Sequence, residues 1–192
     1  MQYMIKSIMV YIIVALLAEA KSIIKKYKLS KREDNFFLIF ENNQICLIIS
    51  GIGKINSSIA TTYIISKIKE SDLKIINLGM CTSKNINSPI GEFIYISKLI
   101  DKSTNNSYHL HHKNGSSLTC VDQALNSSST IKSEFADMES IGFYLSAKKF
   151  INIENIYIIK VVSDILDDRV LKNDFINSIF EKNIDKISEY ID

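Results

Sequence analysis

Short apolar runs rich in β-branched residues alternate along this chain with stretches of helical periodicity. Runs of this kind, bounded by turn residues, are typical of buried strands. The predicted strands are Ile8–Leu17, Phe36–Phe40, Ile45–Ser50, Leu73–Leu78, Ile90–Leu99 and Ile156–Val162. The predicted helices are Glu19–Lys28, Ile55–Glu70, Ile141–Phe150 and Val170–Tyr190. This alternation predicts an α/β fold, specifically a three-layer α/β/α sandwich around a mixed, largely parallel twisted sheet.

Several local expectations follow from the same pattern. Phe36–Phe40 and Ile45–Ser50 are predicted to form a hairpin over Glu41-Asn42-Asn43. In the helix 55–70, one face carries Ile55, Ile59 and Tyr63 and another carries Ile64 and Ile68, so we expect burial around much of its circumference. The Leu73–Leu78 strand is expected to end at Gly79, and the polar segment 101–117 to be a surface loop.

Composition indicates one folded domain over residues 1–192, because hydrophobic residues make up 46% of the chain and charged residues 23%. The net charge of +2 gives no reason to expect nucleic acid, and the lysines of segment 21–32 are taken as a solvated helix face. Cys46, Cys81 and Cys120 are not spaced as a metal motif. We expect buried, reduced thiols and a cytoplasmic protein.

The first apolar run has a competing interpretation. Lys6, the run 8–18 and Ala18-Glu19-Ala20 stand in the order of a signal peptide with an A-x-A cleavage site. The run is too short to span a membrane. Its Ile, Val and Tyr residues and the helical pattern that follows favour a buried strand, so no membrane association is expected.

Carboxylates follow the predicted strands. Glu19 comes just after the first strand, Asp164 just after Ile156–Val162, and Glu139 lies where a loop or strand enters a helix. Ligands of open α/β sheets bind beyond the carboxyl ends of the strands, so Glu19, Gly79 and Asp164 are expected at one edge. Each acid alone has a simpler explanation as a helix cap or first-turn charge. Together they predict an enzyme that uses acid/base chemistry.

Five segments appear in the order and rough spacing of a known family. They are Ala15-Leu16-Leu17-Ala18-Glu19, Ser50-Gly51-Ile52-Gly53-Lys54-Ile55-Asn56, Asn77-Leu78-Gly79, Ala136-Asp137-Met138-Glu139-Ser140 and Val162-Ser163-Asp164. The chain thereby resembles the nucleoside phosphorylase superfamily from about residue 12 to residue 168. The branch it resembles most is that of the methylthioadenosine/S-adenosylhomocysteine nucleosidases.

This resemblance implies hydrolysis of the bond between adenine N9 and ribose C1′. It makes Asp164 the general acid that protonates N7 of the leaving adenine, with Ser163 orienting it, and Glu19 the group that positions and activates water. It makes Glu139 the acceptor for the ribose 2′- and 3′-hydroxyls. Met138 is expected to pack against the sugar, Met80 to lie in the ribose-side loop, and Leu125 in the loop that contacts the purine.

The resemblance further implies a small nucleoside as the substrate, no cofactor, and a homodimer in which a partner loop closes the pocket for the 5′-substituent. The chain departs from the family in one loop, where Gly-Ser-Ala-Gly-Gly is replaced by Gly79-Met80-Cys81-Thr82-Ser83. The bulkier side chains are expected to narrow or reshape the sugar pocket.

Two rival classes of function stay open. One is a phosphorylase, or a nucleosidase for another base such as a futalosine-like substrate. Phosphorolysis calls for arginines around phosphate, and the chain has only Arg32 and Arg169, which favours water as the nucleophile. The other is a nucleoside-binding protein without catalysis, suggested by the altered 79–83 loop.

Two further motifs are given structural interpretations. On a strand His109 and His111 would share a face, but no carboxylate or cysteine is spaced with them, so a flexible polar loop is favoured over a metal site. Gly51 and Gly53 form a lone G-x-G, which favours a strand-to-helix turn over a dinucleotide site.

Overall fold

A computed structural model of the chain describes residues 8–68, 73–111, 114–125, 131–166 and 170–192. Its strands are β1 (Met9–Val14), β2 (Ser30–Arg32), β3 (Leu38–Glu41), β4 (Ile45–Ile49), β5 (Leu73–Ser83), β6 (Phe93–Asp101), β7 (Ser107–His109), β8 (Ser116–Cys120), β9 (Phe135–Asp137) and β10 (Ile156–Asp164). Its helices are α1 (Leu17–Tyr27), α2 (Lys54–Ile65), α3 (Ser140–Ala147), α4 (Asn173–Lys182) and α5 (Ile184–Ile191), with a 3₁₀ turn at Ile153–Asn155.

The strands form one mixed sheet whose centre, in the order β4-β1-β5-β10, is parallel. On one side β3 and β2 continue the sheet in antiparallel pairing. On the other side β6, β8 and β9 lead from β10 back to the end of β5, so this half of the sheet closes on itself. The run 8–18 that also resembled a signal peptide supplies the central strand β1.

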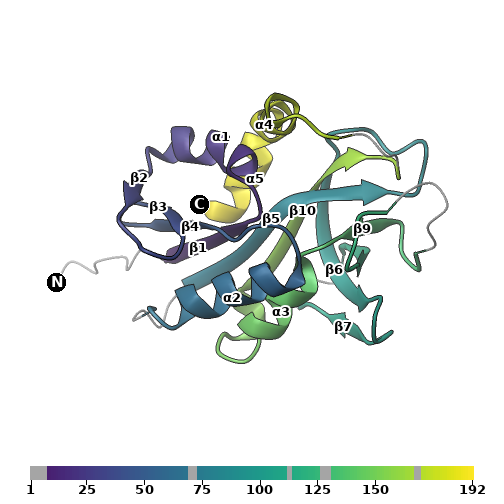
Figure 1. Cartoon of the computed structure of the whole chain (residues 1–192), viewed down its shortest axis with the longest axis horizontal. Coiled ribbons are helices and arrows are strands. Elements are labelled where there is room, and N and C mark those ends of the chain that lie inside the picture. The colour runs from purple at the N-terminus through teal and green to yellow at the C-terminus, as the bar shows by residue number, and fades with distance from the viewer. Residues whose placement is uncertain (1–7, 69–72, 112–113, 126–130, 167–169) are drawn as a thin grey trace.

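Helices cover both faces of the parallel centre, with α1, α4 and α5 on one side and α2 and α3 on the other (Figure 1). The side chains of β1 point alternately to the two faces of the sheet, so this strand contributes to the core on each face. Val10, Ile12 and Val14 pack with the core of α1 and α4, whereas Tyr11 and Ile13 pack with the core of α2 and α3. The three-layer fold predicted from the sequence is therefore confirmed, as is the β3–β4 hairpin.

The C-terminal segment differs from its prediction as one long helix. It forms two helices, α4 and α5, which meet at Asn183. The side-chain amide of Asn183 donates hydrogen bonds to the carbonyl oxygens of Gly91 (2.8 Å) and Ile179 (2.9 Å). These bonds fix the break and tie the helix end to the segment that precedes β6.

The expectation of a surface loop over residues 101–117 is wrong in part. Strand β7 pairs with β6 inside this segment, and β8 begins at Ser116. Gly115 permits the close approach, because a Cβ there would lie 2.7 Å from the backbone nitrogen of Ser97. His109 lies in β7, His111 follows it, and His112 falls outside the described residues; within those residues no cluster of three His, Cys, Asp or Glu side chains is arranged to hold a metal ion.

Helix α2 is less buried than predicted. Ile55 is 76% exposed and Ile59 54% exposed, while Ala60 and Ile64 form the buried face. Helix α3 covers only one side of α2, so the expected burial around the circumference is wrong. None of the described helices is long and apolar enough to cross a membrane. The three cysteines are free and buried, as predicted.

Candidate active site

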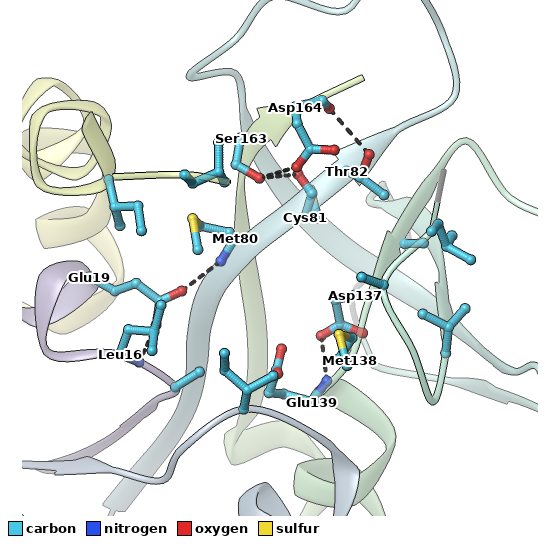
Figure 2. A pocket seen from close by; sticks show the side chains of 18 of the residues that line it. Leu16, Glu19, Met80, Cys81, Thr82, Asp137, Met138, Glu139, Ser163 and Asp164 are labelled. Carbon is cyan, nitrogen blue, oxygen red and sulfur yellow. Dashed lines mark hydrogen bonds between the residues drawn. The ribbon is translucent and has the colours of Figure 1, made fainter. Parts of the chain in front are cut away.

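A cavity of about 470 Å³ lies beyond the carboxyl ends of β1, β5 and β10, and its volume is within the range of small-molecule sites (Figure 2). All the site residues predicted from the sequence line it: Glu19, Met80, Leu125, Met138, Glu139, Ser163 and Asp164. The rest of the wall consists of Ala15, Leu16, Ile52, Cys81, Thr82, Val121, Ala124, Ala136, Asp137, Val170, Leu171 and Ile176. The cavity is thus mainly apolar, with a few carboxylates directed into it.

Glu19 lies in the first turn of α1 and is held at two points. Its Oε2 accepts a hydrogen bond from the backbone N–H of Leu16 (2.7 Å), and its Oε1 accepts one from that of Met80 in β5 (3.0 Å). Burial raises the pKa of the Glu19 carboxyl to about 7, because the charged form is desolvated, and the negative charge of Glu139 adds to the rise. Glu19 is therefore fixed in place and poised to change protonation near neutral pH.

Glu139 stands immediately before α3 and faces the start of α2. Its Oε1 accepts a hydrogen bond from the backbone N–H of Gly53 (2.8 Å). Burial raises the pKa of the Glu139 carboxyl, and the neighbouring charge of Asp137 raises it further. The carboxylate lines the cavity, where it can accept hydrogen bonds from hydroxyl groups of a ligand.

Asp137 closes β9 and organises the turn into α3. Its Oδ1 accepts from the Ser140 hydroxyl (2.6 Å), and its Oδ2 accepts from the backbone N–H groups of Ser140 (2.9 Å) and Glu139 (3.3 Å). The same Oδ2 lies 2.7 Å from Nζ of Lys160. Both side chains of this ion pair are fully buried.

Lys160 was not singled out from the sequence, where it interrupts the apolar run of β10. Burial acts to lower the pKa of its ammonium, but the charges of Asp137 and Glu139 outweigh burial and the pKa is raised. The lysine therefore stays charged behind the cavity and offsets part of the negative charge of the acids. A lone lysine inside an otherwise apolar strand was the signal available in the sequence.

Gly79 makes room for this arrangement. A Cβ at this position would lie 3.2 Å from Lys160 Nζ and 3.3 Å from Glu19 Oε1. Lys160 and Glu19 thus converge over the bare backbone of β5. The strand does not end at Gly79 as predicted but continues to Ser83, because its last residues pair with β9.

Ser163 and Asp164 lie at the end of β10 and line the cavity on another side from Glu19 (Figure 2). The Ser163 hydroxyl donates to Asp164 Oδ2 (2.6 Å) and lies 3.2 Å from the carbonyl oxygen of Cys81. The hydroxyl has one hydrogen, which goes mainly to the shorter Asp164 contact, so it fixes the Asp164 carboxyl beside the Cys81 carbonyl of β5.

The buried ion pair leads to a stability prediction. Lys160→Met removes the charge that compensates buried Asp137, and breaking a buried pair in this way costs about 3–5 kcal/mol of unfolding free energy. Lys26→Met is the matched control, since its partner Asp185 is almost fully exposed and such pairs contribute about 0–1 kcal/mol. Urea denaturation of the two variants measures the difference. Equal, small losses of unfolding free energy in the two variants would show that the Lys160–Asp137 pair does not stabilise the fold.

The fold is that of solved nucleosidase structures, the nucleoside phosphorylase fold. It is similar to the 5′-methylthioadenosine nucleosidase of Arabidopsis thaliana (17% identity, TM-score 0.78, 97% of each chain covered). It is also similar to the 5′-methylthioadenosine/S-adenosylhomocysteine nucleosidase of Helicobacter pylori bound to butyl-thio-DADMe-Immucillin-A (14% identity, TM-score 0.75, 96% of this chain and 98% of the other).

A futalosine hydrolase of Helicobacter pylori is similar as well, with 13% identity, a TM-score of 0.72, and coverage of 96% of this chain and 98% of that one. No protein-family model matches the sequence, and no curated protein is detectably similar in sequence. The likeness to these solved structures establishes a shared fold over nearly the whole chain.

Proposed function

We propose that this protein is a nucleosidase that hydrolyses the N-glycosidic bond of an adenine nucleoside of the methylthioadenosine or S-adenosylhomocysteine type. The observation that carries the proposal is the convergence of Glu19, Glu139 and Asp164 on one mainly apolar cavity. The three acids come from α1, the start of α3 and the end of β10. The structural likeness to nucleosidases supports the reaction class.

In the proposed reaction, Asp164 gives its proton to N7 of the adenine as the bond between N9 and C1′ breaks. Ser163 orients that carboxyl through its 2.6 Å hydrogen bond. Glu19 accepts a proton from the water that adds to C1′, so adenine and the free sugar are the products. A base with a pKa of about 7 suits this step at neutral pH.

The remaining residues bind the substrate in this proposal. Glu139 accepts hydrogen bonds from the two ribose hydroxyls, and Met138 packs its thioether against the sugar. Met80 borders the ribose, and Leu125 lies against the purine. Their common position on the cavity wall supports these assignments.

Water is the proposed nucleophile because nothing on the described wall is suited to bind phosphate. The lining residues include no arginine or lysine within the described part of the chain. Arg32 lies in β2, where it is paired with Glu41 at 2.7 Å, and Arg169 falls outside the described residues. Lys160 is held by Asp137.

An assay of the purified protein against methylthioadenosine, S-adenosylhomocysteine, adenosine and inosine, with and without phosphate, tests the proposal. We expect adenine release from the first two substrates in the absence of phosphate. Release only with phosphate would make the protein a phosphorylase. Preference for inosine would mean that the protein acts on a base other than adenine. Tight nucleoside binding without turnover would make it a binding protein.

The proposed sugar contact predicts the effect of Glu139→Gln. Loss of charge-assisted hydrogen bonds should lower kcat/KM. The corresponding loss of transition-state stabilisation is about 1.5–3 kcal/mol for each bond removed. A 2′-deoxy substrate, which lacks one of the hydroxyls, should be less sensitive to this change than the ribose substrate. Steady-state kinetics on both substrates measures the difference. An equal loss of kcat/KM with both substrates would mean that Glu139 acts only in the structure, by accepting the hydrogen bond from Gly53.

We propose a homodimer, supported by the exposed apolar residues Ile55 and Ile59 on α2, next to Ile52 in the cavity wall. Light scattering should give twice the chain mass for the wild type and a shift toward the monomer for Ile55→Lys/Ile59→Lys. Ile86→Lys is the control, since Ile86 is 79% exposed in the loop between β5 and β6 and is not part of α2. A monomeric wild type that cleaves methylthioadenosine well would contradict the dimer.

A further inference from the structure

The backbone around Asp164 departs from regular strand geometry. Strands β10 and β5 pair in register as far as Val162 and Cys81, and then the register shifts so that Asp164 stands opposite Thr82. A bulge of this kind turns a side chain out of the regular alternation and is a frequent device beside functional sites. At this bulge Ser163 reaches the Cys81 carbonyl and Asp164 faces the cavity.

The turn that follows the bulge is held by one hydroxyl. Thr82 Oγ1 accepts a hydrogen bond from the backbone N–H of Leu166 (2.8 Å) and lies 3.4 Å from the carbonyl oxygen of Asp164, to which it donates. Leu166 has a φ of 44°, in the left-handed region that non-glycine residues rarely adopt. The Thr82 hydroxyl therefore spans the turn and stabilises its least favourable residue.

We propose that the Thr82 hydroxyl is a positioning group that fixes the turn from Asp164 to Leu166 and so holds the Asp164 carboxyl in its reactive orientation. Consecutive residues of β5 then anchor the acid, since the Cys81 carbonyl binds Ser163 and the Thr82 side chain binds the turn. The catalytic part of this inference rests on the proposed function. The conformational part rests on the hydrogen bonds alone.

The kinetic test compares two substitutions that differ by one hydroxyl. Thr82→Val keeps the shape of the side chain and removes both hydrogen bonds, whereas Thr82→Ser keeps the hydroxyl. For Thr82→Val with methylthioadenosine we expect kcat to fall on the order of 10- to 100-fold with KM changed less than about threefold, because small misplacements of a catalytic group are costly. Thr82→Ser should restore most of kcat.

The matched control is Thr61→Val. Thr61 is a fully buried threonine in α2 whose hydroxyl has no hydrogen-bond partner among the described residues. The same change of hydroxyl to methyl there should leave kcat and KM as in the wild type. An equal loss of kcat in both variants would make the effect a general one of replacing a buried threonine and would overturn the inference.

A double-mutant cycle with Asp164→Asn identifies the route of the effect. If Thr82 acts through Asp164, then adding Thr82→Val to Asp164→Asn should change the residual rate by less than about twofold. Additive losses in the cycle would overturn the inference. So would a rise in KM at unchanged kcat, which would make Thr82 a substrate contact.

Amide hydrogen exchange provides a readout that does not depend on activity. The Leu166 N–H should be protected in the wild type and in Thr82→Ser, and should exchange faster in Thr82→Val. Unchanged exchange would overturn the positioning role. If the wild type releases no adenine while Leu166 shows this exchange pattern, the proposed function and the catalytic part fail and the conformational part stands.

Discussion

Asp164→Asn is expected to lower nucleoside turnover by orders of magnitude while leaving the fold and much of the nucleoside affinity in place. The amide has nearly the same shape and can still receive the hydrogen bond from Ser163, but its N–H protons are not acidic enough to be transferred to the leaving base. General acid catalysis contributes roughly 10²–10⁴-fold. We therefore expect kcat with methylthioadenosine to fall by this factor, as measured by release of adenine.

The control for this substitution is Asp185→Asn. Asp185 is an exposed residue of α5 that pairs with Lys26. The same chemical change there should leave turnover as in the wild type. Binding of nucleoside to Asp164→Asn, measured by calorimetry, separates loss of catalysis from loss of the site. Near-normal kcat in Asp164→Asn would refute its assignment as the acid.

Glu19→Gln is the second substitution with a large expected effect. If Glu19 activates water, this variant should lose hydrolysis but still bind nucleoside, because base and sugar make most of their contacts elsewhere. In the wild type, kcat/KM should rise with pH through about 7 as the Glu19 carboxyl loses its proton. If Glu19 is only a charge at a helix start, the substitution should cost about 0.3–1 kcal/mol of stability and leave turnover intact.

The raised pKa of Glu19 also predicts how this variant changes stability with pH. The pKa rises from 4.5 to about 7 on folding, so between these values the folded state binds more protons and loses stability as pH rises. Above pH 7 the full cost of the buried charge is on the order of 3 kcal/mol. Glu19→Gln removes this cost, but its amide NH2 cannot accept one of the two backbone N–H bonds from Leu16 and Met80. By urea denaturation, the stability of the variant relative to the wild type should therefore be higher at pH 8 than at pH 4.

The strand pattern predicted the fold because buried strands carry their signal in the chain itself. The runs that became β1, β4 and β10 are apolar on both faces, as strands between two helical layers must be. Their carboxyl ends then placed Glu19 and Asp164 at one edge of the sheet. The position of the cavity thus followed from local pattern and a topological rule.

Other features depend on contacts that sequence periodicity does not contain. The pattern of α2 showed apolar faces but not that α3 leaves Ile55 and Ile59 uncovered. The break at Asn183 depends on the Gly91 carbonyl, which is remote in the chain. Lys160 appeared as one polar residue in a strand, and only the folded chain brings Asp137 to it.

The central claim is that water attacks the sugar carbon of a bound adenine nucleoside, and isotope labelling tests it most directly. The wild type is incubated with methylthioadenosine in ¹⁸O-water without phosphate, and the products are analysed by mass spectrometry. The account predicts free adenine and a methylthioribose that carries one ¹⁸O, with neither formed by Glu19→Gln. Absence of adenine, or adenine release that requires phosphate and yields an unlabelled sugar phosphate, would contradict it.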